Sequence, residues 1–249
     1  MKKPPKQRAD SILVDRNLVD SRSIAQSLIR AGRVLVNKAK LDTPGQLIDQ
    51  NSEIELIPGP KFVSRGGQKL EGALQGFMLE VSGLTVLDVG ASTGGFTDCL
   101  LQNGANLVYA VDVGRGQLND RIRKDSRVVV MERLNARYQF ELPSRAQLIV
   151  ADLSFISLRK VLPNLVNHLD SKGKMLLLVK PQFESERSNI GKGGVIRDPK
   201  VHAEVVGDFC RWSISMGFRV LGIRRSRLEG SSGNREFFVL LSLNDLNSK

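Results

Sequence analysis

Two lysines and two acids stand where apolar runs of this sequence begin or end. Lys69 follows a pair of glycines, and Asp152 ends the run LIVAD. Lys180 ends the run MLLLVK, and Glu236 opens the last apolar run of the chain. A charge directly after several apolar residues is costly unless it is paired or functional. We therefore expect these four side chains to meet at one edge of a sheet and to form a catalytic group.

A glycine-rich stretch, LDVGASTGGFT from Leu87 to Thr97, lies between the first two of these residues. It predicts a strand, a tight turn and then a helix that Gly104 ends. Glycine lacks a Cβ atom and tolerates positive φ, so such a turn lets the backbone approach a ligand closely. The ligand-binding residues expected here are Asp88, Gly90, Ser92, Gly94, Gly95 and Phe96.

The spacing of this turn favours S-adenosylmethionine over a dinucleotide. A dinucleotide loop has the pattern GxGxxG, but Ser92 occupies the position of its second glycine. Asp88 suits the cationic amine of a methionine group better than it suits a pyrophosphate. About 20 residues further on, Asp112 ends the next predicted strand, where an acid can accept hydrogen bonds from ribose hydroxyls. Asn135 is a candidate for contact with adenine, and Asp152 is a second candidate for contact with the cofactor.

Apolar runs rich in β-branched residues recur along the second part of the chain, with helical segments between most of them. This alternation predicts an α/β fold with a Rossmann-like, doubly wound and mainly parallel sheet. The break Pro58-Gly59-Pro60 separates it from a small N-terminal α/β piece, so we expect domains at residues 1–60 and 61–249. The expected strands of the large domain are Thr85–Val89, Leu107–Val113, Val128–Met131, Leu148–Ala151, Met175–Val179, Phe218–Ile223 and Phe237–Leu243.

The charge of the chain points to a polyanionic partner. The net charge is +11, and residues 1–40 hold ten Lys and Arg against three Asp. A helix from Ser21 to Gly32 would carry an arginine stripe, which is either a solvated face or an RNA-binding surface. Few acids interrupt the stripe, which favours RNA. The RNA-binding residues expected are Arg8, Arg22, Arg30, Arg33, Lys38 and Lys40.

The segment SILVDRNLVDSRSIAQSLIRAGRVLVN resembles the small RNA-binding domain named after ribosomal protein S4. Members of that family often have a glycine in the turn after VN, where this chain has Lys38.

The order Lys69, Asp152, Lys180 and Glu236, with DVGASTGGFT after the first, resembles the K-D-K-E tetrad of the FtsJ-like ribose 2′-O-methyltransferases. The strings VSRGGQKL, ADLSFISLRKVLP, LVKPQFE and GSSGNREFF resemble the TlyA family, also called hemolysin A. The resemblance implies an S-adenosylmethionine-dependent enzyme that methylates a cytidine ribose of ribosomal RNA within ribosomal subunits.

In that reaction a ribose hydroxyl must lose its proton, and Lys180 is the residue expected to help. It acts either as a base or by stabilising the developing alkoxide. Lys69 would lower the pKa of Lys180, whereas Asp152 and Glu236 would orient Lys180 and raise its pKa. The loop from Gln182 to Arg197 is either a lid over the RNA or a surface loop.

Three other functions compete with this interpretation. They are a non-catalytic RNA-binding ribosome-assembly factor, a hemolysin-like membrane-active protein, and another RNA enzyme with the same N-terminal domain, such as a pseudouridine synthase. No apolar run approaches the roughly 18 residues of a membrane span, so we expect a cytoplasmic protein without a membrane partner. Cys99 and Cys210 are too few for a zinc site, and His168 and His202 lack metal-ligand spacing, so we expect no metal.

Overall fold

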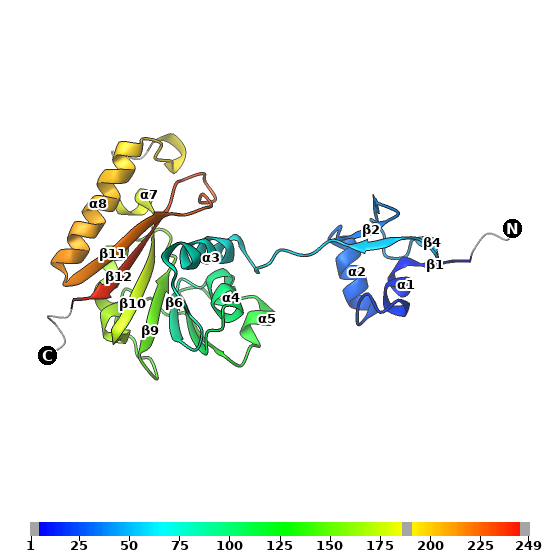
Figure 1. Cartoon of the computed structure of the whole chain (residues 1–249), viewed down its shortest axis with the longest axis horizontal. Coiled ribbons are helices and arrows are strands. Elements are labelled where there is room, and N and C mark those ends of the chain that lie inside the picture. Colours follow the sequence, from blue (N-terminus) through cyan, green and yellow to red (C-terminus); the bar gives the residue numbers. More distant parts are fainter. Residues whose placement is uncertain (1–4, 186–190, 245–249) are drawn as a thin grey trace. The chain divides into compact units, whose positions relative to one another are not determined.

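The computed structural model describes residues 5–185 and 191–244 (Figure 1). The chain divides into two compact units, residues 1–60 and 61–249. Each unit has its own hydrophobic core and is described by itself.

The first unit packs two helices over short strands. Its core consists of buried aliphatic side chains such as Leu13 and Ile29. The helix predicted from Ser21 to Gly32 is confirmed, and its last residue is Arg30. Ser21 caps the second helix, because its hydroxyl accepts a hydrogen bond from the Ile24 amide. The elements are β1 (Lys6–Arg8), α1 (Ala9–Asp15), α2 (Arg22–Arg30), β2 (Val34–Val36), β3 (Ala39–Lys40), β4 (Leu47–Asp49) and β5 (Ile54–Leu56).

A two-residue turn joins β2 to β3, and both of its residues have left-handed backbones. Asn37 has φ 50° and Lys38 has φ 67°. Two consecutive positive φ angles are typical of a type I′ hairpin turn, in which glycine is the preferred second residue. Lys38 therefore adopts the conformation that a glycine would adopt more easily.

The second unit is built around a seven-stranded sheet with the order β11-β12-β10-β9-β6-β7-β8. Strands β10, β9, β6, β7 and β8 are parallel, while β12 is antiparallel to both of its neighbours. All seven predicted strands are confirmed; β10 begins six residues earlier than expected, and the ends of the others differ by at most two residues. They are β6 (Thr85–Val89), β7 (Leu107–Asp112), β8 (Val128–Glu132), β9 (Ala146–Ala151), β10 (Leu169–Val179), β11 (Phe218–Arg225) and β12 (Phe237–Leu243).

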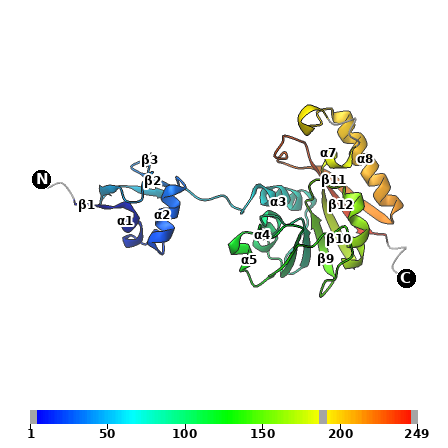
Figure 2. The same ribbon diagram turned by 180° about the vertical axis from the view of Figure 1, so that it is seen from behind.

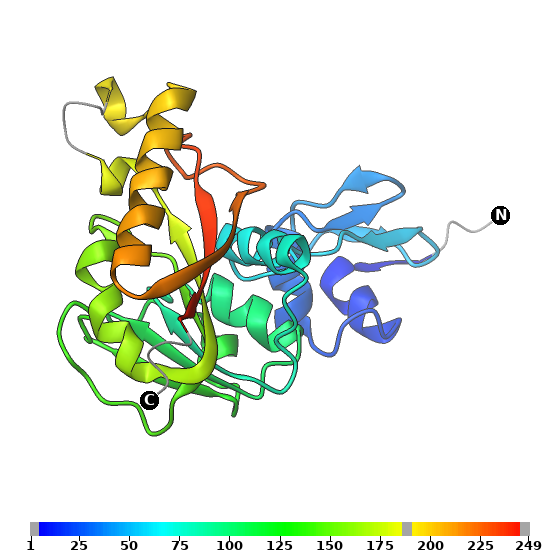
Figure 3. The same cartoon turned by 60° about the vertical axis from the view of Figure 1, so that its left-hand side comes forward.

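Helices cover both faces of this sheet, as a doubly wound fold requires (Figures 1 and 2). Alternate residues of each central strand enter different cores, so that Val86 packs with α3 and α4 while Leu87 packs with α6 and α8. In Figure 3 the orange α8 and the cyan α3 lie to either side of the red β12. The helices are α3 (Arg65–Phe77), α4 (Gly95–Gln102), α5 (Asp120–Arg123), α6 (Leu162–Leu165), α7 (Pro181–Glu184) and α8 (Pro199–Ser215), with short 3₁₀ turns at Leu158–Lys160, Val166–His168 and Lys192–Gly194.

The strand order reverses at β6, which lies between β7 and β9. Ligands of open α/β sheets bind at such a point, beyond the carboxyl ends of the strands. The glycine-rich turn follows β6 there, Asp152 follows β9, and Lys180 follows β10. None of the helices in the described part of the chain is long and apolar enough to span a membrane.

Candidate active site

The glycine-rich turn is packed so closely that side chains would not fit at two of its positions. A Cβ atom on Gly90 would lie 2.5 Å from the carbonyl oxygen of Asp152, and Gly90 has φ 85°. A Cβ atom on Gly95 would lie 2.1 Å from the hydroxyl oxygen of Ser64 and 3.0 Å from the amide nitrogen of Gly67. The turn is therefore held between the end of β9 and the start of α3, with its backbone facing the cavities described below.

Asp88 lies beneath this turn and is fully buried. One of its carboxylate oxygens accepts a hydrogen bond of 2.6 Å from the Thr97 hydroxyl, while the other has no partner among the described residues. Burial raises the pKa of Asp88 to about 7. The side chain lines neither cavity at this edge of the sheet. The predicted contact of Asp88 with the cofactor stays a prediction.

The four residues of the predicted catalytic group meet in one cavity of about 340 Å³, which we call the tetrad cavity. They form two ion pairs rather than one cluster around a single lysine. The lining of the tetrad cavity includes Lys69, Asp152, Lys180 and Glu236, together with Ser64, Arg65, Gly66, Ser231 and residues of the glycine-rich turn.

The first pair joins Lys69 of α3 to Glu236, the residue just before β12. The Lys69 Nζ donates a hydrogen bond of 2.6 Å to Glu236 Oε2, and the two residues are 8% and 2% exposed. Glu236 was expected to orient Lys180, but it contacts the other lysine instead. Packing of α3 against this end of the sheet brings together residues that are 167 positions apart.

The second pair joins Lys180 to Asp152. The Lys180 Nζ lies 2.7 Å from Asp152 Oδ1, at an angle outside hydrogen-bond geometry, and it donates a hydrogen bond of 2.9 Å to the Ser154 hydroxyl. Lys180 is 8% exposed, and its ammonium group lies 5.8 Å from the centre of the Phe183 ring. The sequence did not indicate Ser154 as a site residue, although it follows Asp152 by only two residues.

An adjoining cavity of about 520 Å³, which we call the Asp112 cavity, shares Gly90, Ser92 and Asp152 with the first. Asp112 and Asn135 line it, as expected. Both Asp112 oxygens already accept backbone hydrogen bonds, from Ser92 at 2.8 Å and from Gly114 at 2.7 Å. This carboxylate therefore shapes the glycine-rich turn as well as facing the cavity.

The apolar wall of the Asp112 cavity was not predicted from the sequence. It includes Val111, Val113, Leu134, Leu153 and Ile156. Leu153 directly follows Asp152 and Ile156 comes three residues later, but their side chains alone carry no sign of a ligand.

Phe155, at the rim of the same cavity, was also missed. Its side chain is 92% exposed and its φ is 66°, a conformation that costs a non-glycine residue free energy. Its ring lies 5.4 Å from that of Phe183. The proposed lid from Gln182 to Arg197 falls partly outside the described residues, because residues 186–190 are not described.

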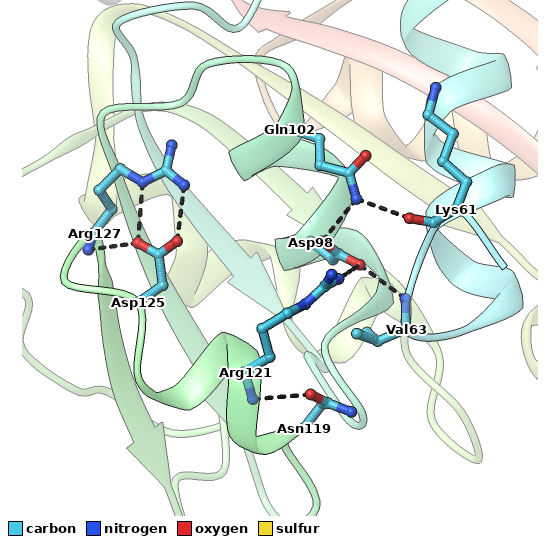
Figure 4. A network of polar contacts seen from close by, with 8 residues as sticks. All are labelled: Lys61, Val63, Asp98, Gln102, Asn119, Arg121, Asp125 and Arg127. Atoms are coloured by element: carbon cyan, nitrogen blue, oxygen red, sulfur yellow. Dashed lines mark hydrogen bonds and ion pairs between the residues drawn. The ribbon is translucent and has the colours of Figure 1, made fainter. Parts of the chain in front are cut away.

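A network around Asp98, in the first turn of α4, holds the start of the second unit in place (Figure 4). The buried Asp98 carboxylate accepts hydrogen bonds from the Val63 amide and the Arg121 guanidinium, both at 2.8 Å. Gln102 donates hydrogen bonds to Asp98 and to the carbonyl oxygen of Lys61. These contacts fix residues 61–63, and with them Ser64, to the helix that follows the glycine-rich turn.

In the first unit, some of the predicted RNA-binding residues are bound to an acid. The buried Asp10 accepts hydrogen bonds from Arg8 and Arg22, which hold the pKa of Asp10 well below its usual range. Of these two arginines only Arg22 belongs to the arginine stripe, and Asp10 reaches it from α1.

The remaining predicted RNA-binding residues of this unit have weaker or neutral partners. Lys40 lies 3.6 Å from Asp42, and Arg33 donates to the carbonyl oxygen of Ile57. Arg30 and Lys38 are exposed.

The fold and the site together define a Rossmann-like methyltransferase with an appended RNA-binding unit. The family model described as FtsJ-like methyltransferase matches residues 62–243, and the S4 domain model matches residues 7–54. The chain belongs to the FtsJ-like methyltransferase family, whose enzymes use S-adenosylmethionine.

Known relatives cover nearly the whole chain. It is 45% identical to "Putative rRNA methyltransferase YqxC" of Bacillus subtilis over 95% of this chain and 85% of the relative. It is 43% identical to "16S/23S rRNA (cytidine-2'-O)-methyltransferase TlyA" of Mycobacterium tuberculosis over 94% of this chain and 89% of the relative. A solved structure titled "Putative hemolysin from Streptococcus thermophilus" is 41% identical, with a TM-score of 0.73, and the match covers 97% of this chain and 90% of that chain.

Proposed function

We propose that this chain transfers a methyl group from S-adenosylmethionine to the 2′-hydroxyl of a cytidine ribose in ribosomal RNA. The observation that carries this proposal is the pairing of Lys69 with Glu236 and of Lys180 with Asp152 in one cavity that adjoins the Asp112 cavity. The name of the relative from M. tuberculosis supports the choice of cytidine and of ribosomal RNA.

The residues at the strand ends suit the cofactor. Gly90 and Gly95 let the turn pack against the end of β9 and the start of α3, and both line the tetrad cavity, where backbone atoms of the turn can contact a ligand. Beneath the turn, Asp88 has one oxygen without a partner among the described residues, so it can accept a hydrogen bond from the amine of the methionine group, whose positive charge would favour the ionised carboxylate. The Asp112 cavity, with an acid, an amide and apolar walls, suits an adenosine. When bound, the cofactor supplies a methyl group that its sulfonium already activates.

Further contacts with the cofactor follow from the same layout. Ser92 belongs to both cavities, while Gly94 and Phe96 shape the turn and the first residues of α4. Asn135 lines the Asp112 cavity together with Asp112, and we assign it to contact with the adenine of the ligand.

Lys180 is the residue that we assign to the hydroxyl. The Lys180 ammonium lies against the Asp152 carboxylate, where it would stabilise the negative charge that develops on the ribose oxygen as the hydroxyl proton passes to water. Asp152 and Ser154 hold its Nζ in position. Lys69, held by Glu236, adds a second positive charge to the same cavity, so the scheme needs no metal.

The RNA is the partner for which the first unit is suited. We assign residues 1–60 to an S4-like RNA-binding domain and residues 61–249 to the methyltransferase domain. Arg30 and Lys38 are free to contact RNA directly, whereas Arg8 and Arg22 do so while also bound to Asp10. Arg33 and Lys40 complete this surface. An enzyme that acts on ribosomal subunits works in the cytoplasm, where we expect this chain.

The proposal is tested by Lys180→Ala. The variant is expected to bind S-adenosylmethionine with unchanged affinity by calorimetry and to lose methyl transfer into ribosomal RNA. A variant that still transfers methyl groups at the normal rate would overturn the role of Lys180. A wild-type chain that binds RNA but transfers no methyl group would instead indicate a ribosome-assembly factor.

A further inference from the structure

Most of the excess positive charge lies in the methyltransferase unit, not in the S4-like unit. Residues 61–249 hold 27 Lys and Arg against 19 Asp and Glu, whereas residues 1–60 hold ten against seven. A basic surface on the catalytic unit attracts polyanions as strongly as one on an RNA-binding domain. Cations of this unit that lie near the tetrad cavity are therefore candidates to bind RNA.

Helix α3 has one face on which such cations gather. Arg65, Lys69, Gly72 and Gly76 are spaced at i, i+4, i+7 and i+11, so they lie along one side of the helix. The stripe is about 16 Å long at 1.5 Å per residue. It starts at the tetrad cavity, because Arg65 and Lys69 both line that cavity.

The two glycines of the stripe hold arginines from the end of β11 and the loop after it. A Cβ atom on Gly72 would lie 2.9 Å from the Cδ of Arg227, and one on Gly76 would lie 2.7 Å from the Cδ of Arg224. Both arginine stems therefore lie directly on the helix backbone. The glycines extend the cationic side of α3 beyond its own residues.

Neutral groups position these arginines, so their charge is not compensated. Arg227 donates a hydrogen bond to Gln75, Arg224 lies 5.4 Å from the centre of the Phe77 ring, and Arg65 donates to the carbonyl oxygen of Glu229. Within the described ranges, none of the three forms an ion pair with a carboxylate. All three are exposed. The carboxylate of Glu229 pairs with Arg225 instead.

We propose that Arg65, Arg227 and Arg224 form a track along α3 that binds successive phosphates of the RNA strand carrying the target ribose. The guanidinium group is suited to phosphate because it donates parallel hydrogen bonds. A stacked strand has one phosphate for about every 3.4 Å of helix axis, so a stripe of about 16 Å spans several of them. The track rests on the proposed function and adds to it the path of the substrate on the catalytic unit.

The test compares Arg224→Gln, Arg227→Gln and the double variant with Arg219→Gln in the full chain. Arg219 is an exposed arginine of β11 that lies about 16 Å along the strand from Arg224, so its variant removes the same charge off the track. Binding of a fluorescein-labelled single-stranded RNA is measured over a range of salt concentrations. Methyl transfer from tritiated S-adenosylmethionine into purified ribosomal RNA gives the KM and kcat.

Each track variant is expected to raise the KM and Kd for RNA by roughly three- to tenfold and to reduce the salt dependence of log K by about 0.7 per lost phosphate contact. The Kd for S-adenosylmethionine and the kcat stay unchanged. Arg219→Gln has less than half of the effect on RNA.

Gly72→Ala and Gly76→Ala test the geometry of the track without changing the charge. Alanine favours the helix, but its Cβ displaces the flexible arginine stem, so both variants fold and bind RNA more weakly. If the double arginine variant matches Arg219→Gln while the wild type methylates RNA, the track is wrong and the proposed function stands. If the wild type neither binds nor methylates RNA, both fail.

Discussion

Removal of one member of the Lys69–Glu236 pair is expected to lower both the stability of the fold and methyl transfer, whereas removal of both charges is expected to lower methyl transfer alone. Lys69→Met replaces the ammonium with an apolar group of similar length and leaves the carboxylate of Glu236, which is 2% exposed, without its partner. Breaking a buried ion pair in this way costs about 3–5 kcal/mol, because an uncompensated charge remains in the interior. In a unit of this size, 1 kcal/mol corresponds to about 2–4 °C in Tm, so the variant should melt roughly 10 °C below the wild type.

The double variant Lys69→Met/Glu236→Gln is the matched control. It removes both charges, and replacement of a whole buried pair by neutral groups is often close to neutral for stability. Thermal unfolding followed by circular dichroism should show most of the lost Tm restored, while methyl transfer stays absent in both variants. A Tm of Lys69→Met equal to that of the wild type, or methyl transfer by the double variant at the normal rate, would refute these roles of the pair.

Three further predictions concern the turn between β2 and β3, the carboxyl beneath the glycine-rich turn, and the network of Figure 4. Lys38→Gly should stabilise the first unit by about 1 kcal/mol in urea unfolding, because it relieves the positive φ, and should weaken RNA binding; loss of stability would contradict this. The pKa of Asp88 is raised to about 7, so the folded chain holds a proton that the unfolded chain releases near pH 4, and the stability from this group is lost as the pH rises through about 7. Asp88→Asn should not lose this stability when unfolding is measured from pH 4 to 8. A pH profile identical to that of the wild type would show that Asp88 does not cause the loss. Asp98→Ala should raise the Kd for S-adenosylmethionine several-fold, because it frees the Val63 amide and Arg121 and loosens one wall of the tetrad cavity; an unchanged Kd would show that the network serves stability alone.

The sheet and the position of the proposed catalytic residues could be predicted because they depend on local patterns. Apolar runs that alternate with helical segments specify parallel strands, and residues at the strand ends then meet at one edge. The predicted strands end at Ala151 and Val179 and begin at Phe237, as β9, β10 and β12 do, so Asp152, Lys180 and Glu236 lie just outside them.

The pairing within the site could not be predicted, because it depends on tertiary packing. Glu236 contacts Lys69 rather than Lys180, since α3 carries Lys69 to the end of the sheet where β12 begins. In the same way, no local pattern shows that Asp10 binds two arginines, or that Ser154 contacts Lys180. Each of these contacts joins residues of different elements.

The central claim is tested most directly by mass-spectrometric mapping of ribose methylation on ribosomal RNA. The RNA is taken from cells that lack the gene and that express either the wild-type chain or Lys180→Ala. We predict that the wild-type chain adds a 2′-O-methyl group to cytidine and that the Lys180→Ala chain, present at equal abundance, adds none. Ribosomal RNA with the same 2′-O-methyl groups in all three strains would contradict the account.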